Sequence, residues 1–159
     1  MDKLLKILRR NGMMEVAQLA LLLDQSEAEV EERLRQLEED GVIKGYRAVI
    51  DFEETEENHV EALVDLKVTP RKDCGFDYVA DKIAQMKEVD SLYLMSGGYD
   101  LSVHISGKTF QDIAMMVAKK LSTIDGVTGT ATHFVLKKYK EDDILFCGEK
   151  RDERGLTNL

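Results

Sequence analysis

The sequence has 159 residues and a mass of 18.0 kDa, enough for one mid-sized domain or two small ones. Its 31 acidic and 22 basic residues give a formal charge of −9, so nucleic acid and anionic membranes repel the chain as a whole. Binding to either would need a local basic face. A hydrophobic content of 43% with 33% charged residues is typical of a globular protein and argues against disorder.

Membrane, secreted and disulfide-rich classes are disfavoured as well. No apolar run approaches the roughly 20 residues that span a bilayer. The N-terminus turns charged again at Arg9 and Arg10, before a signal-peptide core could form. Cys74 and Cys147 lie far apart and outside any CxxC pair, so neither a zinc motif nor a disulfide framework is expected. We therefore expect a cytoplasmic protein without metal, cofactor or membrane partner.

Residues 1–51 are expected to form a small helical domain. Apolar residues at helical spacing predict three helices, with the stripes Leu4, Leu5, Leu8; Val16, Leu19, Ala20, Leu23; and Val30, Leu34, Leu37. Ser26 and Glu29 predict the start of the third helix, because they form a capping box that satisfies free N–H groups of the first turn. Gly41 predicts its end. Residues 42–50 resemble two extended pieces hinged at Gly45. Three helices and a small hairpin make a winged helix-turn-helix.

The acidic stretch from Asp51 to Asn58 holds five carboxylates and little apolar surface, which predicts a solvated connector at residues 52–58. Beyond it, at residues 59–140, the apolar period alternates between two and 3.6 residues in the order βαββαβ. This order predicts an α+β fold of the ferredoxin-like type, a four-stranded antiparallel sheet with two helices on one face.

The uncovered face of that sheet is expected to expose Leu, Val and Phe side chains, so we expect a homodimer formed through it. Residues 141–159 are largely charged beyond a short apolar patch at residues 144–147. They are expected to form a frayed C-terminal tail.

Both halves resemble the Lrp/AsnC (feast/famine) transcriptional regulators. In the first half the resemblance lies in residues 16–20, in Ser26, Val30 and Arg33-Leu34, and in residues 37–46. In the second half it lies in Val89, the run SGGYDL at residues 96–101, Gly126-Val127 and TATHFVLK at residues 130–137. The match runs over about 140 residues in the family's order and spacing. It implies dimers through the effector domain (RAM domain) sheet, octamers in many members, and amino acids bound at contacts between dimers.

The third helix departs from this resemblance because it is acidic where it should read DNA. From Ser26 to Asp40 the chain has seven acids against Arg33 and Arg35, and residues 1–51 have a net charge of −3. Carboxylates that face a groove between phosphate rows are repelled, although Glu27 could accept from a cytosine amino group.

Two hypotheses about DNA follow from this helix. The first is a regulator whose phosphate contacts come from cationic residues and whose third helix supplies unusual base contacts; the candidates are Ser26, Glu27, Arg33, Arg35, Lys44 and Arg47, with Arg9 and Arg10. The second keeps the fold with weak or lost DNA binding, as an oligomeric small-molecule-binding module. Arg33 has a structural alternative too, pairing with Glu29 or Glu32. Asp24 stands where relatives usually have glycine, and aspartate tolerates the left-handed backbone of the turn.

The turn SGGYD is a candidate zwitterion site. Its backbone N–H groups could approach an anion, and Asp100 could accept from an α-ammonium group. The resemblance carries the effector pocket to Gly98, Tyr99, Asp100, Thr130 and Thr132. The alternative is that the glycines only form a tight hairpin that Asp100 caps.

Catalysis has little support in the sequence. His59, His104 and His133 are too scattered to assign a triad or a metal site, and no Gly-rich phosphate loop occurs. His104 and His133 could, however, face each other across neighbouring strands. Sirohaem decarboxylases share a related two-domain architecture, so an enzyme of that type stays as a rival to a non-enzymatic regulator.

Overall fold

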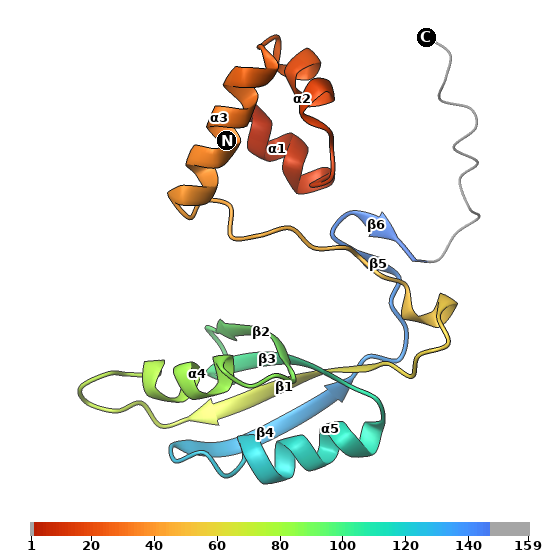
Figure 1. Cartoon of the computed structure of the whole chain (residues 1–159). Coiled ribbons are helices and arrows are strands. Elements are labelled where there is room, and N and C mark those ends of the chain that lie inside the picture. The colour runs from red at the N-terminus through yellow and green to blue at the C-terminus, as the bar shows by residue number, and fades with distance from the viewer. Residues whose placement is uncertain (1, 147–159) are drawn as a thin grey trace. The chain divides into compact units, whose positions relative to one another are not determined.

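The computed structural model describes residues 2–146, which form two compact units (Figure 1). The first unit contains residues 2–50 together with residues 139–146, and the second contains residues 51–138. Of the expected tail, only residues 141–146 are described, and residues 147–159 lie outside the described residues. Within the described residues no helix has the length and apolar character required to cross a membrane.

The first unit contains the three expected helices, α1 (Lys3–Arg10), α2 (Val16–Leu23) and α3 (Glu27–Glu39). Their apolar stripes meet in a small core whose buried members are Leu4, Leu19, Ala20 and Val30. The turn between α2 and α3 contains Asp24 in the left-handed region, with φ 56° and ψ 50°. The expectation that aspartate would sustain this turn is confirmed.

The segment after α3 differs from the expected wing. Residues 42–50 form no β-ladder with any described residue. A hairpin needs a loop of at least two residues between its strands. Here Gly45 alone separates the two expected pieces, which leaves no room for a hairpin loop between them. The hairpin prediction for these residues was wrong, although the three-helix part of the fold is as expected.

A short hairpin near the C-terminus belongs to this same unit. Strands β5 (Lys140–Glu141) and β6 (Ile144–Leu145) pair antiparallel across a two-residue loop. The loop residues Asp142 and Asp143 have φ values of 45° and 68°. Two consecutive positive φ angles define the tight turn whose twist matches paired strands, and Asp is among the residues that accept them. We expected a frayed end here, and the structure shows an ordered turn.

The second unit has the predicted βαββαβ order. A 3-10 turn (Phe52–Glu54) precedes four strands and two helices: β1 (Val60–Val68), α4 (Asp77–Ala84), β2 (Val89–Leu94), β3 (Leu101–Gly107), α5 (Phe110–Met116) and β4 (Val127–Phe134). The sheet is antiparallel in the order β2-β3-β1-β4, with β1 between β3 and β4. The helix α5 continues into a π-helical turn over Val117–Leu121. The α+β ferredoxin-like prediction is confirmed.

Alternate residues of the central strands face the two helices. Val64 and Leu66 of β1 share one core with Ile83 of α4 and Ile113 of α5, and all four are essentially inaccessible to solvent. Because strand residues alternate between faces, their neighbours Glu61, Leu63, Asp65 and Lys67 lie on the opposite face.

That opposite face is more polar than expected. Leu63 is its central apolar residue, 45% exposed, and lies opposite His104 on β3 and His133 on β4. Tyr93 on β2 is exposed opposite Ser102. The predicted display of Leu, Val and Phe was wrong, because nearly all such residues in these strands occupy the helix-covered positions of the alternation.

Candidate functional site

The N-terminus of α3 is the part of a helix-turn-helix unit that would enter a DNA groove. Ser26 caps it: its Oγ accepts from the Glu29 N–H at 3.3 Å, and the Glu29 carboxylate accepts from the Ser26 N–H at 2.8 Å. The hydroxyl also donates to Glu29 at 2.7 Å, and these bonds lower the pKa of Glu29. Ser26, a predicted DNA contact, is therefore already used to start the helix. Glu27 lies beside it on an exposed position.

The three arginines predicted to contact DNA each have carboxylate partners inside the first unit. Arg33 lies 2.5 Å from Asp2, which corrects the expected pairing with Glu29 or Glu32. Arg35 bridges Glu32 and Glu39 on its own helix, and these two carboxylates raise its pKa. Arg47 pairs with Asp142 and, at 3.4 Å, with Glu141. Lys44 has no ion pair among the described residues. Of the two arginines of α3, Arg35 is therefore neutralised by acids of its own helix, and Arg33 by the residue that caps α1.

The SGGYD turn joins β2 to β3 and is fixed to the end of β1. The Asp100 N–H donates to the Leu66 carbonyl at 2.9 Å, and Asp100 Oδ2 accepts from the Val68 N–H at 2.8 Å. Lys67 Nζ donates to the Gly98 carbonyl at 3.1 Å and lies 3.4 Å from Asp100. The bond from Val68 is the main cause of a lowered pKa of Asp100, assisted by Lys67. Asp100 therefore ties the turn to β1.

The threonines of β4 lie on the helix-covered face, opposite inward residues of β1. Thr130 pairs with Leu66, and Thr132 pairs with Val64, further from the turn. Gly98, Asp100 and Thr130 thus surround the same end of β1, whereas Thr132 lies toward the middle of the sheet. Tyr99 is 39% exposed. The sequence did not predict Lys67 as a residue of this site. Its one indication in the sequence is its position on the solvent-facing side near the end of an alternating strand.

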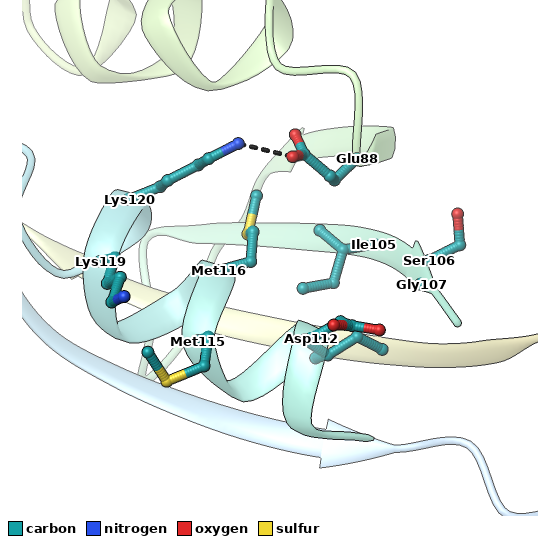
Figure 2. A pocket seen from close by; sticks show the side chains of 10 residues that line it. Glu88, Ile105, Ser106, Gly107, Asp112, Met115, Met116, Lys119 and Lys120 are labelled. Carbon is teal, nitrogen blue, oxygen red and sulfur yellow. Dashed lines mark hydrogen bonds and ion pairs between the residues drawn. The ribbon is translucent and has the colours of Figure 1, made fainter. Parts of the chain in front are cut away.

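A hollow of about 320 Å³ in this unit lies between α5, its π-helical extension and the ends of β3 and β2 (Figure 2). Its apolar side includes Ile105, Met115 and Met116. Figure 2 shows Lys120 reaching toward Glu88, with an Nζ–Oε1 distance of 2.5 Å. Thioether groups beside paired charges are compatible with a zwitterion that has an apolar side chain. No motif in the sequence indicated this hollow.

The histidines do not form the arrangement that would favour an enzyme. His104 and His133 do not lie on neighbouring strands, because β1 separates β3 from β4 and Leu63 lies between the two residues. His104 instead bonds Glu61 at 3.2 Å, and His59 bonds the same carboxylate at 3.0 Å. No group of three or more metal-ligating side chains is assembled anywhere in residues 2–146.

Comparison with known proteins agrees with both halves of the fold. A family model for winged helix-turn-helix DNA-binding domains matches residues 3–44, and the Lrp/AsnC ligand-binding domain matches residues 61–145. The chain is therefore a transcriptional regulator with a DNA-binding and a ligand-binding domain. It belongs to the Lrp/AsnC family.

Individual relatives are similar over nearly their whole length. An uncharacterized HTH-type transcriptional regulator from Bacillus subtilis, YugG, is 42% identical over 96% of this chain and 92% of its own. The HTH-type transcriptional regulator FL11 from Pyrococcus furiosus is 31% identical over 87% of this chain and 89% of its own. These relatives are named as regulators and not as enzymes.

Solved structures share the fold at lower identity. A transcriptional regulator from Neisseria meningitidis, NMB0573, in complex with L-Met, is 24% identical with a TM-score of 0.71, and the match covers 89% of this chain and 93% of that one. AsnC from E. coli is 21% identical with a TM-score of 0.68, and the match covers 89% of this chain and 95% of that one.

Proposed function

We propose that this protein regulates transcription by binding double-stranded DNA through its first unit and an amino acid through its second. The observation that carries the proposal is the combination, in one chain, of a helix-turn-helix core and a ligand-binding domain, each matched by its own family model. We also propose a cytoplasmic location, which a DNA partner supports.

DNA binding is tested by gel retardation on the promoter region of the protein's own gene. A retarded band at about 50 mM salt that weakens at about 200 mM salt is expected, because phosphate contacts release counterions. Absence of retardation at the lower salt concentration would overturn this half of the proposal and favour the small-molecule-binding alternative. A haem titration that produced a new visible absorbance band would instead favour the decarboxylase-like alternative.

We propose the end of β1 as the effector site, with Gly98, Tyr99, Asp100, Thr130 and Thr132 as its candidate residues. The geometry supports this choice because Asp100 Oδ2 accepts from the Val68 N–H, while within residues 2–146 the partner of Oδ1 is the Lys67 ammonium at 3.4 Å. A carboxylate has about four acceptor positions, so Oδ1 can accept from an α-ammonium group. The L-Met complex of the Neisseria structure supports an amino acid as the ligand class.

The effector is sought by thermal shift against single amino acids. A ligand at 100 times its dissociation constant stabilises the folded state by about 2.7 kcal/mol. Asp100→Asn should abolish the shift, and Lys119→Gln, in the hollow beside α5, should preserve it. A shift that is kept in Asp100→Asn and lost in Lys119→Gln would instead indicate that the ligand binds in that hollow.

We further propose a homodimer formed through the open face of the sheet, with higher assembly to an octamer. Leu63 supports this face as an interface, because it presents apolar surface at the centre of an otherwise polar sheet.

A further inference from the structure

The first unit has a basic face that lies outside α3, the acidic third helix. Arg9 and Arg10 of α1 border two hollows, and Lys6 lines one of them and Arg47 the other; we call these four residues the basic face. The smaller hollow, of about 430 Å³, is lined by Lys3, Lys6, Ile7, Arg9, Arg10 and Asp143. Among the described residues that line it, Asp143 of the C-terminal hairpin is the one acid.

The hairpin presents its carboxylates to this face. Asp142 and Asp143 form the tight turn, and Asp142 lines the larger hollow, of about 580 Å³, with Arg9, Arg10 and Arg47. Asp142 and Glu141 pair with the Arg47 guanidinium. Asp143 lies 3.0 Å from Lys140 and lines the smaller hollow. The hydrogen bond from Lys140 first, with its positive charge, and then the charges of Arg9 and Arg10 lower the pKa of Asp143.

The contact between the hairpin and the basic face matters because other arginines of the first unit already have carboxylate partners. Arg33 and Arg35 are already paired with Asp2, Glu32 and Glu39. The basic face therefore holds most of the cations that DNA phosphates could engage, and the hairpin holds carboxylates against it. Carboxylate and phosphate oxygens bind arginine through the same donors.

We propose that the basic face is the phosphate-contacting surface of this regulator and that the acidic hairpin is an intramolecular competitor for it. DNA must displace Glu141, Asp142 and Asp143 before its phosphates reach Arg9, Arg10 and Arg47. The hairpin thus lowers non-specific affinity, and any event that withdraws it raises that affinity. This inference rests on the proposed DNA binding, because DNA is the partner that competes with the hairpin. The ion pairs between the hairpin and the basic face do not depend on that proposal.

The test is a double variant, D142N/D143N, compared with wild type in the full-length chain. Asparagine accepts positive φ, so the turn is retained and only its two charges are removed. The matched control is E56Q/E57Q in the acidic connector, which changes the net charge equally at exposed positions. Far-UV circular dichroism establishes that each variant is folded.

Two probes are used: a duplex of arbitrary sequence at about 50 mM salt, and a heparin column. We expect D142N/D143N to bind the duplex about three- to tenfold more tightly than wild type, the range of one or two exposed ion pairs. It should also elute from heparin at higher salt, and the control should shift by less than about twofold. A hairpin variant that behaves like the control on both probes would overturn the proposal. Later elution from heparin with no duplex binding by any variant would uphold the competitor and refute the proposed function.

Discussion

A single carboxylate, Asp2, holds two of the helices of the first unit in register. Its Oδ1 accepts from the Leu4 N–H at 2.9 Å and so caps α1, while its Oδ2 pairs with Arg33 of α3 at 2.5 Å. The pair is partly shielded, with the Asp2 side chain 23% exposed. A residue near the chain end thereby joins local helix capping to a long-range contact.

Replacing Asp2 by alanine should lower the free energy of unfolding by about 1–2 kcal/mol, because both the cap and the ion pair are lost. Asp2→Asn keeps a side-chain oxygen for the Leu4 N–H and should cost less than about 1 kcal/mol. Urea denaturation followed by circular dichroism measures both. Equal losses in the two variants would show that the cap contributes nothing.

Asp100 predicts a pH dependence at the residue scale. Its pKa is lowered in the folded state, mainly by the Val68 N–H. The folded chain therefore holds fewer protons than the unfolded chain, and the stabilisation is complete above the unfolded pKa, near 4. It is lost as the pH falls through the folded pKa. The difference in urea midpoint between wild type and Asp100→Asn should accordingly be larger at pH 7 than at pH 3; a constant difference would contradict the assignment.

At the scale of elements, α3 combines core contacts of Val30, Leu34 and Leu37 with a strong local signal at its start. Only Val30 of its thirteen residues is buried, yet its first turn has a complete capping box. Such a helix depends on its cap more than one with a broad buried stripe.

Ser26→Ala should therefore destabilise the first unit by about 1 kcal/mol. Ser26→Asp retains an acceptor at the cap and should restore most of the loss. Thermal unfolding monitored by circular dichroism is the measurement, and an unchanged melting temperature in the alanine variant would refute the dependence on the cap.

Local signals also explain which elements could be predicted from sequence. The helices of the first unit and the βαββαβ order follow from apolar period, caps and turn residues, all of which are encoded nearby in the chain. The predictions that failed concern which side chains form ion pairs with one another. Neither the pairing of Arg33 with Asp2 nor that of Arg47 with Asp142 has a short-range signal, because the partners are 31 and 95 residues apart.

The position of the candidate effector residues could be predicted from sequence only in part, for the same reason. The SGGYD turn is a local motif, so its position between β2 and β3 was predictable. Lys67 was not predictable as a partner of that turn, because the contact arises only when β1 and β3 pair in their observed register. The face on which Thr130 and Thr132 lie likewise depends on the register between β4 and β1.

At the scale of the whole molecule, the proposed dimer places Leu63 at an interface. Leu63→Arg should convert the dimer to monomer, because it introduces a charge at the centre of the sheet face. Met115→Arg, at a position of similar exposure on α5, is the control and should leave the dimer intact. Sedimentation velocity distinguishes the species. A Leu63→Arg protein that still sediments as a dimer would exclude this face as the interface.

The carboxylate of Glu61 has a further consequence for self-association. It accepts from His59 and His104 and binds Lys138 at 2.9 Å, while Asp65 lies 3.5 Å from His133. A twofold axis brings a surface against its own copy, so unpaired charges on it would tend to meet charges of the same sign. Here the two acids of the face are matched to bases within one subunit. Each copy therefore presents acids that already have hydrogen-bonding or basic partners beside them, which lessens the repulsion between two chains of net charge −9.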